Sequence, residues 1–143
     1  MAYWIKITYE RNEYVIDLDR ISAFACAPNG KITFWLPDSA IPIILTQQSN
    51  YKNHQQVLEY IQKLAAHSLL GSWIRIIYER NEYLIDLNRI SSFCHYPRGK
   101  LMFWLPDSSI PIIINSYKDL DTYQKILDYI QRETGHKLSM DNG

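Results

Sequence analysis

Paired carboxylates are the first residues in this chain whose type and spacing could support chemistry. Glu10 and Glu13 flank two turn residues, and Glu79 and Glu82 do the same further along. Such a pair could transfer protons or bind a cation. However, the tip of a tight turn projects into solvent, where nothing moves a carboxyl pKa towards neutrality. We therefore expect cross-strand charge pairs here, or a contact made by both turns.

A cysteine and a histidine offer the second possibility. Cys94 could act as a nucleophile beside His95, or Cys26, Cys94 and His95 could together hold zinc. The spacing matches no metal-binding motif, and strand neighbours such as Cys94 and His95 point to opposite faces. We therefore expect no catalytic residue, no metal and no cofactor. An enzyme with a pocket between the repeats near Cys94 and His95 is kept as an alternative.

An acidic and a basic residue recur where the second strand of each half bends. Asp17 and Arg20 are matched by Asp86 and Arg89. The simplest interpretation is a local ion pair that fixes the bend. The functional alternative is anion binding, because a guanidinium can grip a carboxylate or phosphate with two hydrogen bonds.

These candidates occur in pairs because residues 4–65 recur as residues 73–134 at a constant offset of 69, with no insertion or deletion. Tyr9-Glu10-Arg11-Asn12-Glu13-Tyr14 is repeated as Tyr78-Glu79-Arg80-Asn81-Glu82-Tyr83. This fidelity predicts a tandem duplication of one supersecondary unit.

Hydrophobic periodicity predicts the elements of that unit. Alternating apolar residues over 5–18 indicate a hairpin, with its turn at Arg11-Asn12 because Asn tolerates a left-handed backbone. Further strands are expected over 22–27, 31–36 and 41–45. A helix follows, in which Val57, Leu58, Ile61 and Leu64 form an apolar stripe. Asn53 and Asp121 are the expected N-caps, and Gly135 is expected to end the second helix.

The fold class that follows is α+β, a β-β-β-β-β-α unit present twice. Residues 1–67 are the first repeat, 68–72 a connector, 73–135 the second repeat and 136–143 a flexible tail. Each repeat alone would bury a thin core, so the halves should pack together. We expect antiparallel sheets packed about a pseudo-twofold axis, with the helices outside.

Both faces of the expected sheet are apolar, which indicates a contact surface within the chain or between chains. The apolar residues opposite the expected helix include Trp4, Val15, Trp35, Trp73, Ile77, Leu84 and Trp104. The four tryptophans are the first candidates for this surface. The second set comprises the turn residues Arg11 and Arg80 and three residues where the repeats diverge, His95, Tyr96 and Arg98.

The charge balance and hydropathy of the chain limit the classes of partner that we expect. Fifteen basic residues balance fifteen acidic ones, so no net field attracts nucleic acid or anionic lipid. No stretch approaches the roughly 20 apolar residues of a membrane helix, and no export signal is evident. We expect free thiols and a cytoplasmic location. Single-stranded nucleic acid stacked on Trp35 and Trp104, with phosphates near Lys31, Lys100 and Arg98, is a further alternative.

The wording Trp-Ile-x-Ile-x-Tyr-Glu-Arg-Asn-x-Tyr-x-Ile-Asp-Leu, followed by Gly-Lys-x-x-Phe-Trp-Leu-Pro-Asp-Ser, resembles small duplicated proteins of cyanobacterial type. That resemblance covers both repeats and implies no activity. Strands closed by a C-terminal helix also resemble a pleckstrin-homology-like half-barrel. The repeat lacks two of that fold's seven strands, so its ligand grooves are not carried over.

The function predicted from sequence is therefore a non-enzymatic protein-interaction or assembly module. Its partner would be another protein, and leftover apolar sheet surface or an exposed edge strand would favour a homodimer.

Overall fold

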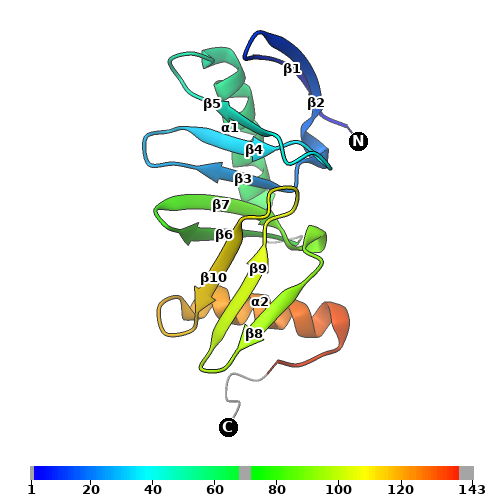
Figure 1. Ribbon diagram of the computed structural model, residues 1–143, viewed down its shortest axis with the longest axis vertical. Helices are drawn as coiled ribbons and strands as arrows, with labels where there is room; N and C mark the ends of the chain where they lie inside the picture. The colour runs from blue at the N-terminus through cyan, green and yellow to red at the C-terminus, as the bar shows by residue number, and fades with distance from the viewer. Residues whose placement is uncertain (1, 68–71, 139–143) are drawn as a thin grey trace. The chain divides into compact units, whose positions relative to one another are not determined.

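The computed structural model describes residues 2–67 and 72–138. It is an α+β protein in which five strands, with a short 3-10 turn after the second, precede a helix, in the same order twice (Figure 1). The first set is β1 (Trp4–Tyr9), β2 (Asn12–Asp17), β3 (Ala23–Cys26), β4 (Ile32–Trp35), β5 (Pro42–Leu45) and α1 (Tyr51–His67). The second set is β6 (Trp73–Tyr78), β7 (Asn81–Asp86), β8 (Phe93–Tyr96), β9 (Lys100–Trp104), β10 (Pro111–Asn115) and α2 (Leu120–Thr134).

The predicted hairpins form, but their turn residues differ from the prediction. Tyr9 pairs with Asn12, so Glu10 and Arg11 make the turn, with φ of 49° and 70°. A two-residue turn of this kind needs positive φ at both central positions. The predicted left-handed residue, Asn12, instead belongs to β2. Alternation of apolar residues sets this register, because a shift by one residue would turn the apolar side chains outward.

The helix starts also differ from the prediction. Asp119, rather than Asp121, caps α2 by accepting the backbone N–H of Thr122. Helix α1 begins two residues before Asn53, whose side-chain amide donates to the Lys6 carbonyl at 2.9 Å. Gly135 does end α2, in the left-handed conformation at φ 79°.

The strand order joins the second hairpin to the strands of the first set. The five-stranded antiparallel sheet runs β5-β4-β3-β7-β6, so the second hairpin pairs with β3 of the first set. Phe24 lies opposite Leu84, and Ala25 lies opposite Tyr83. The β1–β2 hairpin forms a separate two-stranded sheet, and β10-β9-β8 forms a three-stranded sheet.

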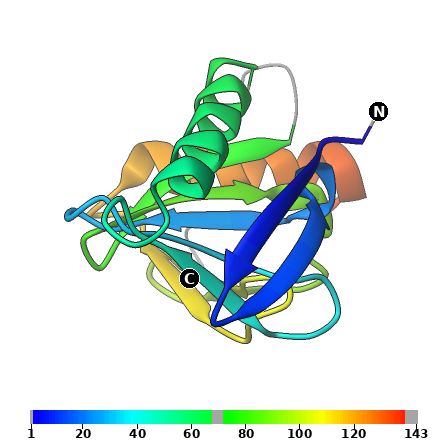
Figure 2. The same cartoon turned by 90° about the horizontal axis from the view of Figure 1, so that it is seen from above.

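The chain divides into two compact units, the first comprising residues 1–89 and 105–109. Its core lies between the sheet, α1 and the inner face of the β1–β2 hairpin, and Figure 2 shows α1 across one face of the sheet. The predicted inward residues Ile5, Ile7, Ile16, Ile32 and Phe34 are buried there. Leu84, predicted on the face away from the helix, belongs to this core too. The β6–β7 hairpin therefore turns the face that carries Leu84, which was predicted to point away from the helix, into the core of the first unit.

The second unit comprises residues 90–104 and 110–143. Its described core joins the three-stranded sheet to α2 through alternating strand residues and the apolar stripe of the helix. Leu101, Phe103, Ile112, Ile114, Tyr123, Ile126 and Ile130 are buried in it. Phe93 packs on Phe103 and on Tyr129, with ring centroids 5.7 Å and 6.4 Å apart.

Neither described helix is both long enough and apolar enough to cross a membrane.

Burial of Leu84 gives a direct test of the strand order. Leu84→Ala should lower the free energy of unfolding by about 2–5 kcal/mol, because it leaves a cavity beside Phe24. Ile77→Ala, at an exposed position of the same hairpin, should change it by less than about 0.5 kcal/mol. Urea titrations of both variants measure the difference. Equal effects would contradict the burial of Leu84 in the core of the first unit.

Candidate interaction surface

The four tryptophans occupy different environments. Trp4 on β1 is 62% exposed and Trp104 on β9 is 41% exposed. Trp35 is buried in β4, so it presents no face for an outside partner. Trp73 is half-buried and stacks on Phe24, with centroids 6.3 Å apart. Trp4 and Trp104 are thus the tryptophans with surface available for contact.

An open groove of about 540 Å³ lies beside β2, lined by residues 14–17 of that strand and by Trp4 of β1. Trp4 and Val15 form its apolar wall, and Leu36 and Pro37 line it from the turn after β4. Val15 is 67% exposed. The groove therefore combines large exposed apolar side chains with backbone of an edge strand, which is a surface suited to binding another polypeptide.

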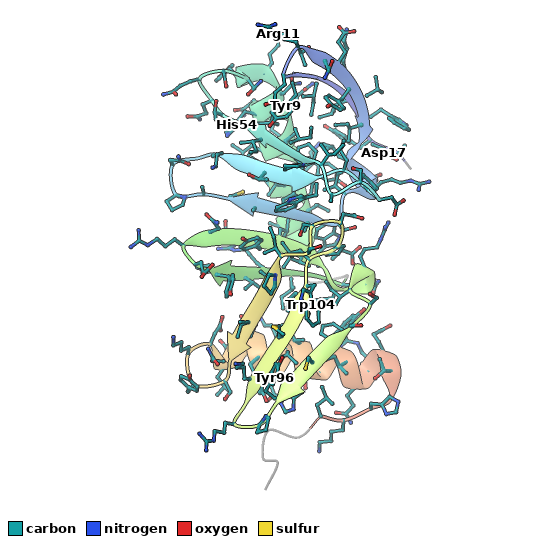
Figure 3. All side chains as sticks on the ribbon, in the orientation of Figure 1. Tyr9, Arg11, Asp17, His54, Tyr96 and Trp104 are labelled. Carbon is teal, nitrogen blue, oxygen red and sulfur yellow. The ribbon has the colours of Figure 1, made fainter. Side chains whose placement is uncertain are left out.

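At one end of this groove, Asp17 holds the bend after β2 through two hydrogen bonds. Its Oδ1 accepts the backbone N–H of Tyr3 at 2.9 Å and that of Asp19 at 3.0 Å. Figure 3 shows Asp17 and Arg11 at opposite ends of the hairpin. The carboxylate thus acts as a cap of the following 3-10 turn, whereas sequence analysis expected an ion pair with Arg20. Arg20 lines the groove.

The equivalent bend after β7 is built in the same way. Asp86 Oδ1 accepts the hydroxyl of Ser72 at 2.5 Å and the backbone N–H of Asn88 at 3.1 Å. Arg89 Nε is 4.0 Å from Asp86, at the limit of an ion pair. Backbone capping is therefore the device that both bends share, and the ion pair expected from sequence forms at the second bend, between Arg89 and Asp86.

The hairpin tips carry exposed charge. Arg11 and Arg80 sit in the turns with positive φ and are exposed. Behind them, Lys6 pairs with Glu13 at 3.1 Å and Arg75 pairs with Glu82 at 2.6 Å. The carboxylates thus make the cross-strand charge pairs expected from sequence, at positions too exposed to contribute much to stability.

The divergent residues of the second unit make separate local contacts. His95 Nε2 lies 2.7 Å from the Tyr123 hydroxyl, and burial raises the Tyr123 pKa. The Lys100 ammonium lies 4.9 Å from the centroid of the Tyr96 ring. Arg98 is exposed in the turn before β9, with φ 71°. His95 and Tyr96 are thus tied to neighbours in their own unit.

The two cysteines are half-buried free thiols. Burial raises the pKa of Cys26, and the nearby Glu82 carboxylate raises it further. A raised thiol pKa disfavours the thiolate that nucleophilic catalysis needs. Among the described residues, no three His, Cys, Asp or Glu side chains gather closely enough to hold a metal ion.

Sequence reasoning missed one buried polar residue. His54 in α1 is buried, with Nε2 2.6 Å from the Gly30 carbonyl and Nδ1 without a hydrogen-bond partner. It ties the helix to the turn between β3 and β4. Its place in the i, i+3, i+4 stripe with Val57 and Leu58 is the signal that could have indicated burial.

No protein-family model, curated protein or solved structure matches this chain.

The contribution of Glu82 to the raised Cys26 pKa, which adds to the larger effect of burial, is testable by alkylation. Glu82→Gln should lower the Cys26 pKa and speed its reaction with iodoacetamide at pH 7, because the repelling charge is removed. Glu13→Gln, the equivalent change on the first hairpin, should leave that rate unchanged. Peptide mass spectrometry over time follows Cys26 separately from Cys94. An unchanged rate in Glu82→Gln would contradict the assigned cause.

Proposed function

We propose that this chain is a non-enzymatic protein-interaction module that binds a polypeptide in the groove beside Trp4 and Val15. The observation that carries the proposal is a contrast between positions 69 residues apart in the sequence. Val15 is 67% exposed, whereas Leu84 is 4% exposed because it packs against β3. A hairpin of nearly the same sequence is thus covered by a strand in one place and uncovered in the other.

The exposed side chains beside the groove are of types that contribute strongly to binding. Burying an aliphatic side chain contributes about 1.5–3 kcal/mol, and an aromatic one buries about 150–250 Å². Tryptophan and arginine are also the residue types that most often dominate binding energy at interfaces. Trp4 would supply the apolar anchor and Arg20 a polar contact at the rim of the groove.

The two alternatives from sequence have less support. Stacking of bases on Trp35 is blocked because that residue is buried. A thiol enzyme near Cys94 and His95 would need a nucleophile and base in one pocket, and His95 instead contacts Tyr123. The equal numbers of acidic and basic residues also favour a protein partner over nucleic acid.

Affinity capture with matched variants tests the proposal. Val15→Lys places a charge in the groove, whereas Ile77→Lys places the same charge at an exposed position outside it. Wild type and Ile77→Lys should capture a protein partner even after nuclease treatment. The yield of that partner should fall at least tenfold with Val15→Lys. Equal retention by all three forms would contradict binding in this groove.

A further inference from the structure

The pairing of β7 with β3 is a template for a second contact that the chain leaves unmade. Strand β2 corresponds to β7 at an offset of 69 residues, with Asn-Glu-Tyr-Val-Ile-Asp in place of Asn-Glu-Tyr-Leu-Ile-Asp. By the same offset β3 corresponds to residues 92–95, which overlap β8 except for Ser92, and Phe93 takes the place of Phe24. Strands β2 and β8 each have one neighbour in the described chain, β1 and β9 respectively. Each therefore has a vacant edge where its counterpart has a partner.

Burial on the β8 side shows what the missing strand would cover. Residues 21–25, which include all of β3 except its last residue, are buried, and Phe24 is fully so. Their counterparts are Ile90, Ser91, Ser92, Phe93 and Cys94, none of which is buried. Apolar side chains such as Ile90 and Phe93 thus line an open backbone edge. This is the surface that pairing with β7 closes in the first unit.

Ring contacts identify the missing partner more closely. Phe24 contacts three rings, those of Phe34, Tyr60 and Trp73. Phe93 contacts the counterparts of the first two, Phe103 and Tyr129. The counterpart of Trp73, by the same offset, is Trp4, and Trp4 is exposed over the groove. Trp4 is thus exposed where its counterpart Trp73 stacks on a phenylalanine, and Phe93 has two of the three ring contacts that Phe24 makes.

We infer that the occupant of the groove is strand β8 of a second copy of this chain, so that copies associate head to tail. This inference rests on the proposed function and specifies its partner. Copying the β3–β7 register puts Val15 opposite Phe93 and Tyr14 opposite Cys94. Trp4 then stacks on Phe93, and Val15 takes the buried place that Leu84 has beside Phe24. Glu13 lies opposite His95, a cross-strand pair of acid and imidazole.

A second copy fits better than an unrelated protein because every chain carries both halves of the contact. Each chain has one β1–β2 hairpin and one β8 edge. The pairing of β3 with β7 inside the chain shows which register and which side-chain contacts such a pairing uses. Reciprocal pairing closes a symmetric dimer, whereas one-way pairing leaves free ends for further copies.

An engineered disulfide tests the register. The Asp86 N–H donates to the Ser22 carbonyl at 2.9 Å, so ladder alternation makes Ala25 and Tyr83 a non-hydrogen-bonded pair. Cα atoms of such pairs lie about 4.5 Å apart, inside the range of roughly 4.4–6.8 Å that disulfides span. Tyr14→Cys in a Cys26→Ser background should therefore oxidise to Cys94 of another molecule. Most of the protein should then run as a covalent dimer or larger species under non-reducing conditions.

Two controls make that result specific. Glu13→Cys in the same background places the thiol one residue away, on the opposite face, and should cross-link at least tenfold more slowly. Ala25→Cys with Tyr83→Cys, in a background with Cys26→Ser and Cys94→Ser, should close a disulfide within one chain. Equal cross-linking at positions 13 and 14 would overturn the register. A disulfide between positions 14 and 94 within a monomer would overturn the inference that a second copy occupies the groove.

Light scattering separates failure of this inference from failure of the proposed function. Wild type and Ile77→Lys should show a mass of at least two chains at high micromolar concentration, whereas Val15→Lys should be a monomer. A monomeric wild type that still captures a different protein, with capture lost in Val15→Lys, would overturn self-association and leave the groove function in place. A monomer that captures nothing would contradict both.

Discussion

Backbone pairing between β3 and β7 is the interaction on which the rest of this structure depends. It carries the second hairpin into the first unit, where Leu84 and Trp73 pack against Phe24 beneath α1. It also leaves β3 with a neighbour on each edge, so that no hydrogen-bonding edge of this buried strand is open to water. Without this pairing, Phe24 would lie beside an open edge, as Phe93 does.

One consequence is that two nearly identical segments have different surroundings. The β6–β7 hairpin belongs to the five-stranded sheet, with β7 inside it and β6 at its edge. The β1–β2 hairpin, of nearly the same sequence, is a separate two-stranded sheet. Two-stranded ribbons are marginal unless they pack on something else. The β1–β2 hairpin meets this need on one face only, through Ile5, Ile7 and Ile16 in the first core. Its other face carries Trp4 and Val15 outward, and our functional account follows from that face.

Much of the local structure could be predicted from sequence because it depends on local patterns. Alternation located the strands, the apolar stripe located the helices, and Gly135 marked the end of α2. The turn at Glu10 and Arg11 was misplaced because register, rather than the turn propensity of Asn12, decided it. Asp119 and Asp121 both precede the apolar stripe of α2, and only the geometry of the first turn distinguishes the cap.

The pairing of strands between the repeats could not be predicted in the same way. The two hairpins are nearly identical, and β3 and β8 carry a phenylalanine at equivalent positions, Phe24 and Phe93. The sequence pattern alone therefore does not say whether β7 pairs with β3 or with β8. Apolar residues on both faces predicted that each face needs cover, but they did not indicate which strand pairs with which. The candidate site depends on that choice, because exposure of Val15 and Trp4 follows from which hairpin is paired. Packing about a pseudo-twofold axis stays a prediction, as does each resemblance noted from sequence.

Nuclear Overhauser effects between Hα protons measure this choice most directly. Non-hydrogen-bonded pairs in antiparallel sheets bring their Cα atoms to about 4.5 Å, which is close enough for a strong Hα–Hα signal. The structure predicts that signal between Ala25 and Tyr83, which lie opposite each other in β3 and β7. A signal between Ala25 and Tyr14, or between Cys94 and Tyr83, in its place would show each hairpin paired within its own repeat and would contradict the account.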